Sequence, residues 1–92
     1  MYKIDYVVFR KYYKPHFEGD DSVGKFRVSE CGELGYKDRY MDAADEILER
    51  CKMYHNEKGY LFDLIGQGEF KVSYKRHNYD AVIKYKIIKF DV

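Results

Sequence analysis

Two stretches near the end of the chain decide the fold: Phe70-Lys71-Val72-Ser73-Tyr74-Lys75-Arg76 and Val82-Ile83-Lys84-Tyr85-Lys86-Ile87. In each, an aromatic or aliphatic residue recurs at every second position, mostly with Lys or Ser between. Side chains of a β-strand point alternately to its two faces, so this period predicts strands with one buried and one solvated side. We therefore expect an antiparallel sheet whose lysines mark its outer side.

Applied to the whole chain, the same alternation and its interruptions predict a single α+β domain over residues 1–92 in the order ββαβββ. We expect a five-stranded, mainly antiparallel sheet with strands at 2–13, 23–31, 60–65, 69–76 and 81–92. Apolar residues at steps of three and four predict one helix over 41–56, packed on one face of the sheet.

Several local features are expected from turn and cap residues. Asp38 or Asp42 is the expected helix N-cap, and Gly59 the expected stop. Gly66-Gln67-Gly68 predicts one hairpin and 77–80 a second, with Asn78 in the left-handed conformation. A break in the alternation near Val7–Phe9 indicates a bulge or burial on both faces, and a second break predicts a bulge near Ile87. The last expected feature is a loop at Gly32 and Gly35.

Composition narrows the classes of protein. Hydrophobic residues make up 46% of the chain and aromatic residues 18%, which argues against a disordered protein. The net charge is only +1, with basic ends and an acidic middle. No apolar run approaches the roughly 20 residues that span a bilayer, so no membrane association is expected. Two cysteines are too few for a disulfide framework, and we expect a cytoplasmic protein with reduced thiols.

Excess tyrosine is the main functional clue. Eleven tyrosines exceed what a small core holds, and exposed tyrosine is enriched at protein interfaces. Our leading hypothesis is a small non-enzymatic protein-binding module, in concrete form a phage- or mobile-element-type accessory protein that inhibits or modulates a host factor. The expected contact residues are acidic or aromatic: Glu18, Asp20, Asp21, Tyr36, Tyr40, Asp45 and Glu49.

Two alternatives stay open beside this hypothesis. A basic sheet face with nearby rings is typical of nucleic-acid binding, because cations follow the phosphate backbone and bases stack on aromatic side chains. Its expected residues are Lys25, Arg27, Lys71, Lys75, Lys84 and Lys86. The other alternative is a structural homodimer formed by pairing of exposed strand edges, so the chain is expected as a monomer or a homodimer.

Metal and catalytic chemistry find weaker support in the sequence. Cys51 and His55 lie four positions apart on the predicted helix, and Cys31 and His77 are the further residues able to complete a zinc site, but no paired-cysteine spacing is present. The acidic loop lacks the ligand spacing of a calcium loop. His77 beside Asp80 is an acid–base pair in sequence, yet no nucleophile or phosphate-binding motif accompanies it. We expect no metal, no cofactor and no enzyme activity.

Overall fold

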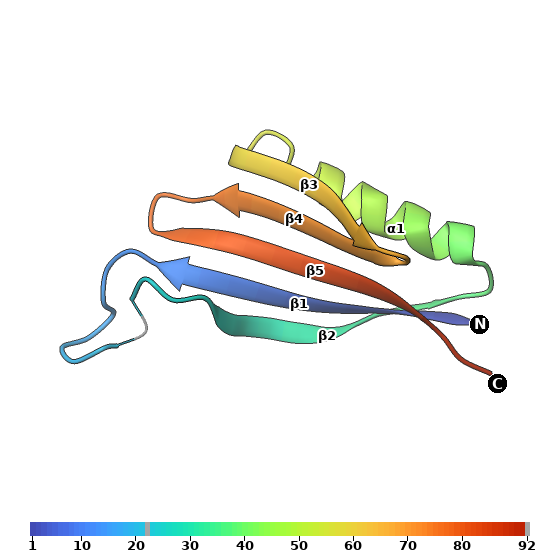
Figure 1. Ribbon diagram of the computed structural model, residues 1–92, viewed down its shortest axis with the longest axis horizontal. Helices are drawn as coiled ribbons and strands as arrows, with labels where there is room; N and C mark the ends of the chain where they lie inside the picture. The colour runs from blue at the N-terminus through green and yellow to red at the C-terminus, as the bar shows by residue number, and fades with distance from the viewer. Residues whose placement is uncertain (22, 92) are drawn as a thin grey trace.

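The computed structural model describes residues 1–21 and 23–91, which form five strands and one helix (Figure 1). The predicted α+β class and the ββαβββ order are confirmed. The elements along the chain are β1 (Tyr2–Tyr12), β2 (Arg27–Lys37), α1 (Tyr40–Lys52), β3 (Lys58–Gly66), β4 (Glu69–Lys75) and β5 (Tyr79–Lys89).

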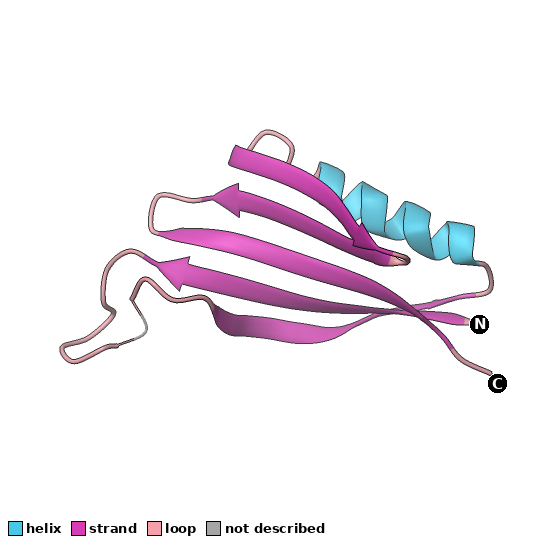
Figure 2. Cartoon of the chain, in the orientation of Figure 1, coloured by secondary structure: helices cyan, strands magenta, loops and turns pink. Residues whose placement is uncertain are grey.

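All strand pairs are antiparallel, in the spatial order β2-β1-β5-β4-β3. The β1–β2 hairpin and the β3–β4–β5 meander are both as predicted. They are joined by pairing of β1 with β5, the two long strands at the centre of the sheet (Figure 2). The register of this pair runs without a shift from Tyr2 opposite Lys89 to Tyr12 opposite Tyr79. This long central pair leaves β2 and β3 as the two edges of the sheet. None of the described helices has the length and apolar character needed to cross a membrane.

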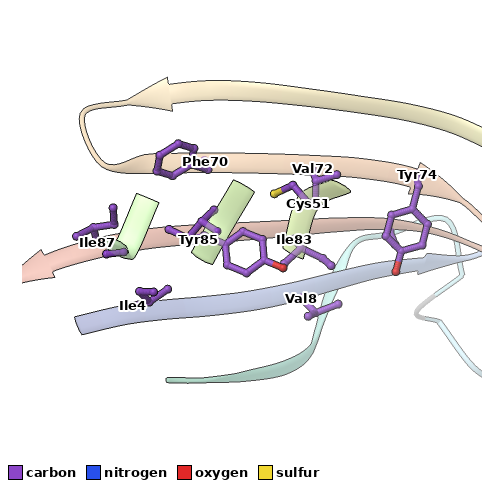
Figure 3. Close-up of a cluster of buried hydrophobic side chains, with 12 residues drawn as sticks. Ile4, Val8, Cys51, Phe70, Val72, Tyr74, Ile83, Tyr85 and Ile87 are labelled. Atoms are coloured by element: carbon purple, nitrogen blue, oxygen red, sulfur yellow. The ribbon is translucent and has the colours of Figure 1, made fainter. Parts of the chain in front are cut away.

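The core lies between α1 and one face of the sheet. Three helix residues at helical spacing, Ala43, Ile47 and Cys51, are buried there. Figure 3 shows the sheet side of this cluster, to which neighbouring strands contribute every second residue. Those sheet residues are Ile4, Val8, Phe70, Val72, Tyr74, Ala81, Ile83, Tyr85 and Ile87. The alternation read from the sequence therefore identified the buried side of β4 and β5 correctly.

Strand β2 is where the prediction fails most. It runs over Arg27–Lys37 rather than 23–31, and Gly32 and Gly35 lie inside it instead of forming a loop. Tertiary pairing explains the difference: β1 pairs with β2 from Tyr2 to Arg10, and this pairing keeps the glycine-containing segment extended. A Cβ on Gly32 would lie 3.2 Å from Cε1 of Tyr6, so glycine here permits a close approach of the neighbouring ring. Gly35 has a φ of 122°, which favours glycine.

The two breaks in the alternation, near Val7–Phe9 and near Ile87, had different outcomes. The β1–β2 register shifts between Val8 and Phe9, as expected in position, but the extra residue, Ser29, belongs to β2. No shift occurs near Ile87, where both partners of β5 stay in register. Ile87 is buried, and the next residue, Ile88, faces the opposite side of the sheet beside Lys3. Two adjacent isoleucines therefore reflect a strand with apolar residues on both faces, and the predicted bulge was wrong.

Helix and turn boundaries also differ in detail. The helix ends at Lys52 rather than at residue 56, and its N-cap is Arg39, which makes no side-chain cap bond. Asp42 instead lies in the first turn, where its Oδ2 is 3.3 Å from Nε of Arg39. Asn78 is not left-handed, because among the described residues only glycines have positive φ. The expected end of the last strand at Val92 falls outside the described residues.

Candidate functional site

The sheet face that points away from α1 is uncovered, and we call it the open face. Directly opposed residues of antiparallel strands share a face. Because Val8 and Ile83 are opposed and buried under the helix, the adjacent pairs Val7–Lys84 and Phe9–Val82 point to the open face. The same registers assign its other principal members: Lys3, Asp5, Lys11, Val28, Cys31, Glu33, Tyr36, Leu61, Asp63, Glu69, Lys71, Ser73, Lys75, Asp80, Lys86 and Ile88.

An apolar floor crosses the centre of the open face. Val7, Phe9 and Val82 are half-buried on the sheet, while Val28 is 60% exposed and Phe26, which precedes β2, is 46% exposed. Two hollows of about 290 and 310 Å³ lie along this floor. The first is lined by Asp5, Tyr6, Val7, Ile65, Glu69, Lys84, Tyr85 and Lys86, and the second by Phe9, Phe26, Lys71, Val82 and Lys84.

We call these two hollows together the trough. Lys84 lines both hollows and so lies at the centre of the trough. Its Nζ lies 5.5 Å from the centre of the Phe9 ring, and Nζ of Lys11 lies 5.1 Å from that of Phe26. Lysines over aromatic rings of this kind gain a modest cation–π attraction. The centre of the open face therefore combines exposed apolar area with fixed positive charge.

Around the trough, lysines alternate with carboxylates. The ion pairs on this face join Lys3 to Asp5 (3.6 Å) and Glu33 (3.3 Å), Lys11 to Asp80 (3.3 Å), Lys71 to Asp63 (4.0 Å) and Lys86 to Glu69 (3.9 Å). The contact with Glu33 is the largest cause of a raised pKa at Lys3. Each exposed pair adds little stability, typically below about 1 kcal/mol. Their main effect is to leave the open face with mixed rather than uniformly basic charge.

Lys84 differs from the ion-paired lysines around the trough. It stands opposite Lys71 on β4 and opposite Val7 on β1, and no carboxylate of the described chain forms an ion pair with it. Like charges directly opposite one another in a sheet are destabilising. An incoming carboxylate or phosphate group placed between these two lysines would remove that repulsion.

The predicted basic residues are only partly brought together. Lys71, Lys75, Lys84 and Lys86 all lie on the open face, as expected. Lys25 lies in the loop before β2, and Arg27 stands opposite Arg10, whose position in β1 places it on the helix side of the sheet. The predicted basic face is thus a group of four lysines with carboxylates between them.

The predicted acidic and aromatic contact residues do not form one surface. The loop that carries Glu18, Asp20 and Asp21 lies at one end of the molecule, and the turn from β2 into α1 lies at the other (Figure 1). The long dimension of the molecule is 49 Å. At the second end, Tyr36 donates its hydroxyl to Glu33 (3.0 Å) and packs edge-on against Phe90, while the ring of Tyr40 packs against that of Tyr2.

The acidic side of the helix is a separate region again. A hollow of about 370 Å³ is lined by Lys37, Asp42, Asp45, Glu46 and Glu49. In the acidic loop, Asp20 accepts a hydrogen bond from the backbone N–H of His16 (3.1 Å). No group of three or more potential metal ligands occurs within the described ranges.

The candidate zinc residues are spread out. Cys51 is in the core, where burial raises the pKa of its thiol to about 11, so it is a poor thiolate ligand at neutral pH. His55 is exposed, with Nδ1 2.8 Å from the Lys52 carbonyl oxygen, and Cys31 is exposed on β2. Asp80 accepts a hydrogen bond from the Tyr13 hydroxyl and forms an ion pair with Lys11. Its partners among the described residues therefore do not include His77.

Sequence reasoning missed a cluster of arginines and tyrosines beyond the end of the helix. The guanidinium of Arg10 lies 4.6 Å from the ring centre of Tyr79, and that of Arg76 lies 5.3 Å from Tyr74. Tyr54 stacks on Tyr74 at 4.6 Å. This cluster covers the part of the sheet that α1 does not reach, which explains how many of the surplus tyrosines are used. In the sequence, the cluster was indicated locally only by the two-residue spacing of Arg10 and Tyr12, which places both side chains on the same face of a strand.

Comparison with known proteins adds no relative. No protein-family model matches the chain, and neither the curated proteins nor the solved structures contain a similar one.

Proposed function

We propose that this protein is a protein-binding module and that the open face is its contact surface. The observation that carries the proposal is the trough, an apolar floor with hollows, surrounded by alternating lysines and carboxylates. Protein interfaces commonly have this arrangement, with a desolvated centre and a polar rim.

The open face supports this role better than the acidic residues that the sequence suggested. The β1–β2 loop, which carries Glu18, and the start of α1 at Tyr40 lie towards opposite ends of the molecule, so one small partner surface does not reach both (Figure 1). The charged groups of the open face are also partly paired already, which lowers the cost of desolvating them on binding.

The partner that fits is a protein surface with apolar side chains for the trough and a carboxylate for Lys84. Complementary charge of this kind favours register and speeds encounter more than it adds affinity. In the form we propose, the protein acts by occupying a surface of its partner, which is how an accessory protein inhibits or modulates a host factor.

Affinity capture from the source organism with quantitative mass spectrometry tests the proposal. The bait proteins are the wild type, an open-face double variant (Phe9→Thr with Val28→Thr) and a control (Met41→Thr) on the outer side of α1. We expect a partner that the wild type and the control enrich equally and that the double variant loses by tenfold or more. Circular dichroism verifies that all three are folded. A partner retained by the double variant would refute the open face as the contact surface.

A second candidate, binding of single-stranded nucleic acid, is favoured by one specific observation. Lys84 and Lys71 are opposed beside the Phe9 ring, so a phosphate and a stacked base have places on the same floor. The interleaved carboxylates oppose it. Fluorescence anisotropy with a labelled oligothymidine at 20 and 200 mM salt separates the candidates, using Lys84→Ala and a helix control, Lys52→Ala. Absence of binding at 20 mM salt would dismiss this candidate.

A further inference from the structure

The two edges of the sheet are protected to different degrees. Exposed strand edges invite pairing with another chain, and proteins commonly block them with charges and bulges. Edge strand β2 carries charged residues along its whole length: Arg27, Glu30, Glu33 and Lys37. Its pairing with β1 is also interrupted by two register shifts. These features make β2 a poor template for a further strand.

Edge strand β3 carries much less charge. Between Lys58 and Gly66 its one other charged residue is Asp63. Leu61 is 55% exposed, Leu64 66% and Ile65 46%, although each is a large apolar side chain. The β3–β4 pairing also has two register shifts, one on each side of the segment from Leu61 to Leu64, but within that segment the register is regular.

We infer that β3 pairs with β3 of a second copy of this chain, antiparallel and about a two-fold axis perpendicular to the sheet. Such a contact is isologous, and it extends the two five-stranded sheets into one. The second copy is the occupant that β3 fits, because β3 has exposed apolar side chains on both sides of the strand and an identical strand offers apolar or aromatic partners on both sides. On one side are Leu61 and Ile65, and on the other is Leu64.

The register follows from which side chains share a face. The residue on the two-fold axis opposes its own copy, so each of the four residues from Leu61 to Leu64 is a geometric candidate for that position. Asp63 on the axis would place two carboxylates directly opposite, which is disfavoured. Phe62 or Leu64 on the axis would place the Asp63 carboxylate opposite an apolar side chain. Leu61 on the axis avoids both arrangements. With Leu61 on the axis, Tyr60 of each copy opposes Phe62 of the other. Aromatic pairs and apolar pairs of this kind each stabilise a sheet by about 0.2–1 kcal/mol.

The direction of the two-fold axis determines where the two open faces lie in the dimer. A two-fold axis perpendicular to the sheet places both open faces on the same side of the dimer. If the open face binds a protein, the dimer presents that surface twice. The dimer itself forms through β3 alone, so its test does not depend on the open face having a partner.

Sedimentation equilibrium between 1 and 200 µM tests the inference. We expect the wild type to associate to twice the 11.1 kDa of one chain. Leu61→Lys, which places two lysines together on the axis, and Leu64→Lys should each weaken the dissociation constant by tenfold or more. Val28→Lys is the matched control on the other edge and should leave it unchanged. Because all three side chains are largely exposed, circular dichroism should show native folds.

The register is tested by cross-linking in a Cys31→Ser background. Leu61→Cys should join two chains through a short bis-maleimide, whereas Val28→Cys should not. A wild type that stays monomeric at 200 µM would overturn the inference. So would a dimer that Val28→Lys dissociates as strongly as Leu61→Lys, because the contact would then lie at the β2 edge or on the open face.

Discussion

Replacing Ile47 by alanine tests how strongly core packing holds α1 on one face of the sheet. That packing is what leaves the opposite face, the open face, uncovered. Ile47 is fully buried and lies between Ala43 and Cys51, the two other buried residues of the helix. The substitution removes three carbon atoms, worth about 2.4 kcal/mol at about 0.8 kcal/mol each. A residual cavity of roughly 50 Å³ adds about 1.2 kcal/mol. The better helix propensity of alanine returns about 0.4 kcal/mol.

The expected net loss is therefore about 3 kcal/mol of unfolding free energy, which a domain with about 5–15 kcal/mol of stability survives. Urea unfolding followed by circular dichroism measures it. With a slope near 1 kcal/mol per molar, the midpoint should fall by roughly 3 M at constant slope. Met41→Ala, on the same helix but 68% exposed, is the control and should change stability by less than about 0.5 kcal/mol. A loss below about 1 kcal/mol for Ile47→Ala would refute the reasoning.

Three further outcomes are expected. Burial raises the pKa of Tyr74 to about 12, so the folded state keeps a proton that the unfolded state loses above pH 10. The free energy of unfolding should then fall by roughly 2–3 kcal/mol between pH 10 and 12. Urea titrations at several pH values should show a smaller fall for Tyr74→Phe, and an equal fall in the variant contradicts this. A hydrogen bond from Tyr13 lowers the pKa of Asp80, so its stabilisation is complete above about pH 4 and is lost as pH falls further. Asp80→Asn should flatten this acid decline, and an equally steep decline speaks against the contact. Gly32→Ala should lower the melting temperature by several degrees, because the new Cβ would lie 3.2 Å from the Tyr6 ring and the hydroxyl of that ring is hydrogen-bonded to Glu30. An unchanged or higher melting temperature would show that the ring moves aside.

Local patterns were sufficient where both partners of a strand are close in sequence. The period of Phe70, Val72 and Tyr74 identified the buried side of β4, and the Gly66-Gln67-Gly68 turn identified its hairpin. They failed at β2, where glycines normally read as a loop are held in a strand by pairing with β1. They failed again at Ile87, where two adjacent isoleucines indicate apolar residues on both faces of one strand.

For the candidate site, the sequence predicted that Lys71, Lys75, Lys84 and Lys86 share a face, because a period of two is a property of each strand alone. It could not show that carboxylates from β1 and β3 lie between these lysines. The sequence analysis also placed Glu18 and Tyr36 in one predicted surface. In the structure most of β2 lies between them, and because a strand rises about 3.3 Å per residue, it separates them towards opposite ends of the molecule.

The amino-acid sequence by itself determined the secondary structure, its order and the inward side of most strands, since alternation and turn chemistry act between near neighbours. The tertiary structure decided the rest: the pairing of β1 with β5, the face that α1 covers, and which strands are edges. These depend on contacts between residues far apart in the chain, such as Lys84 with Phe9 or Lys11 with Asp80. The open face and the unprotected edge of β3, which carry both proposals, exist because of that long-range register.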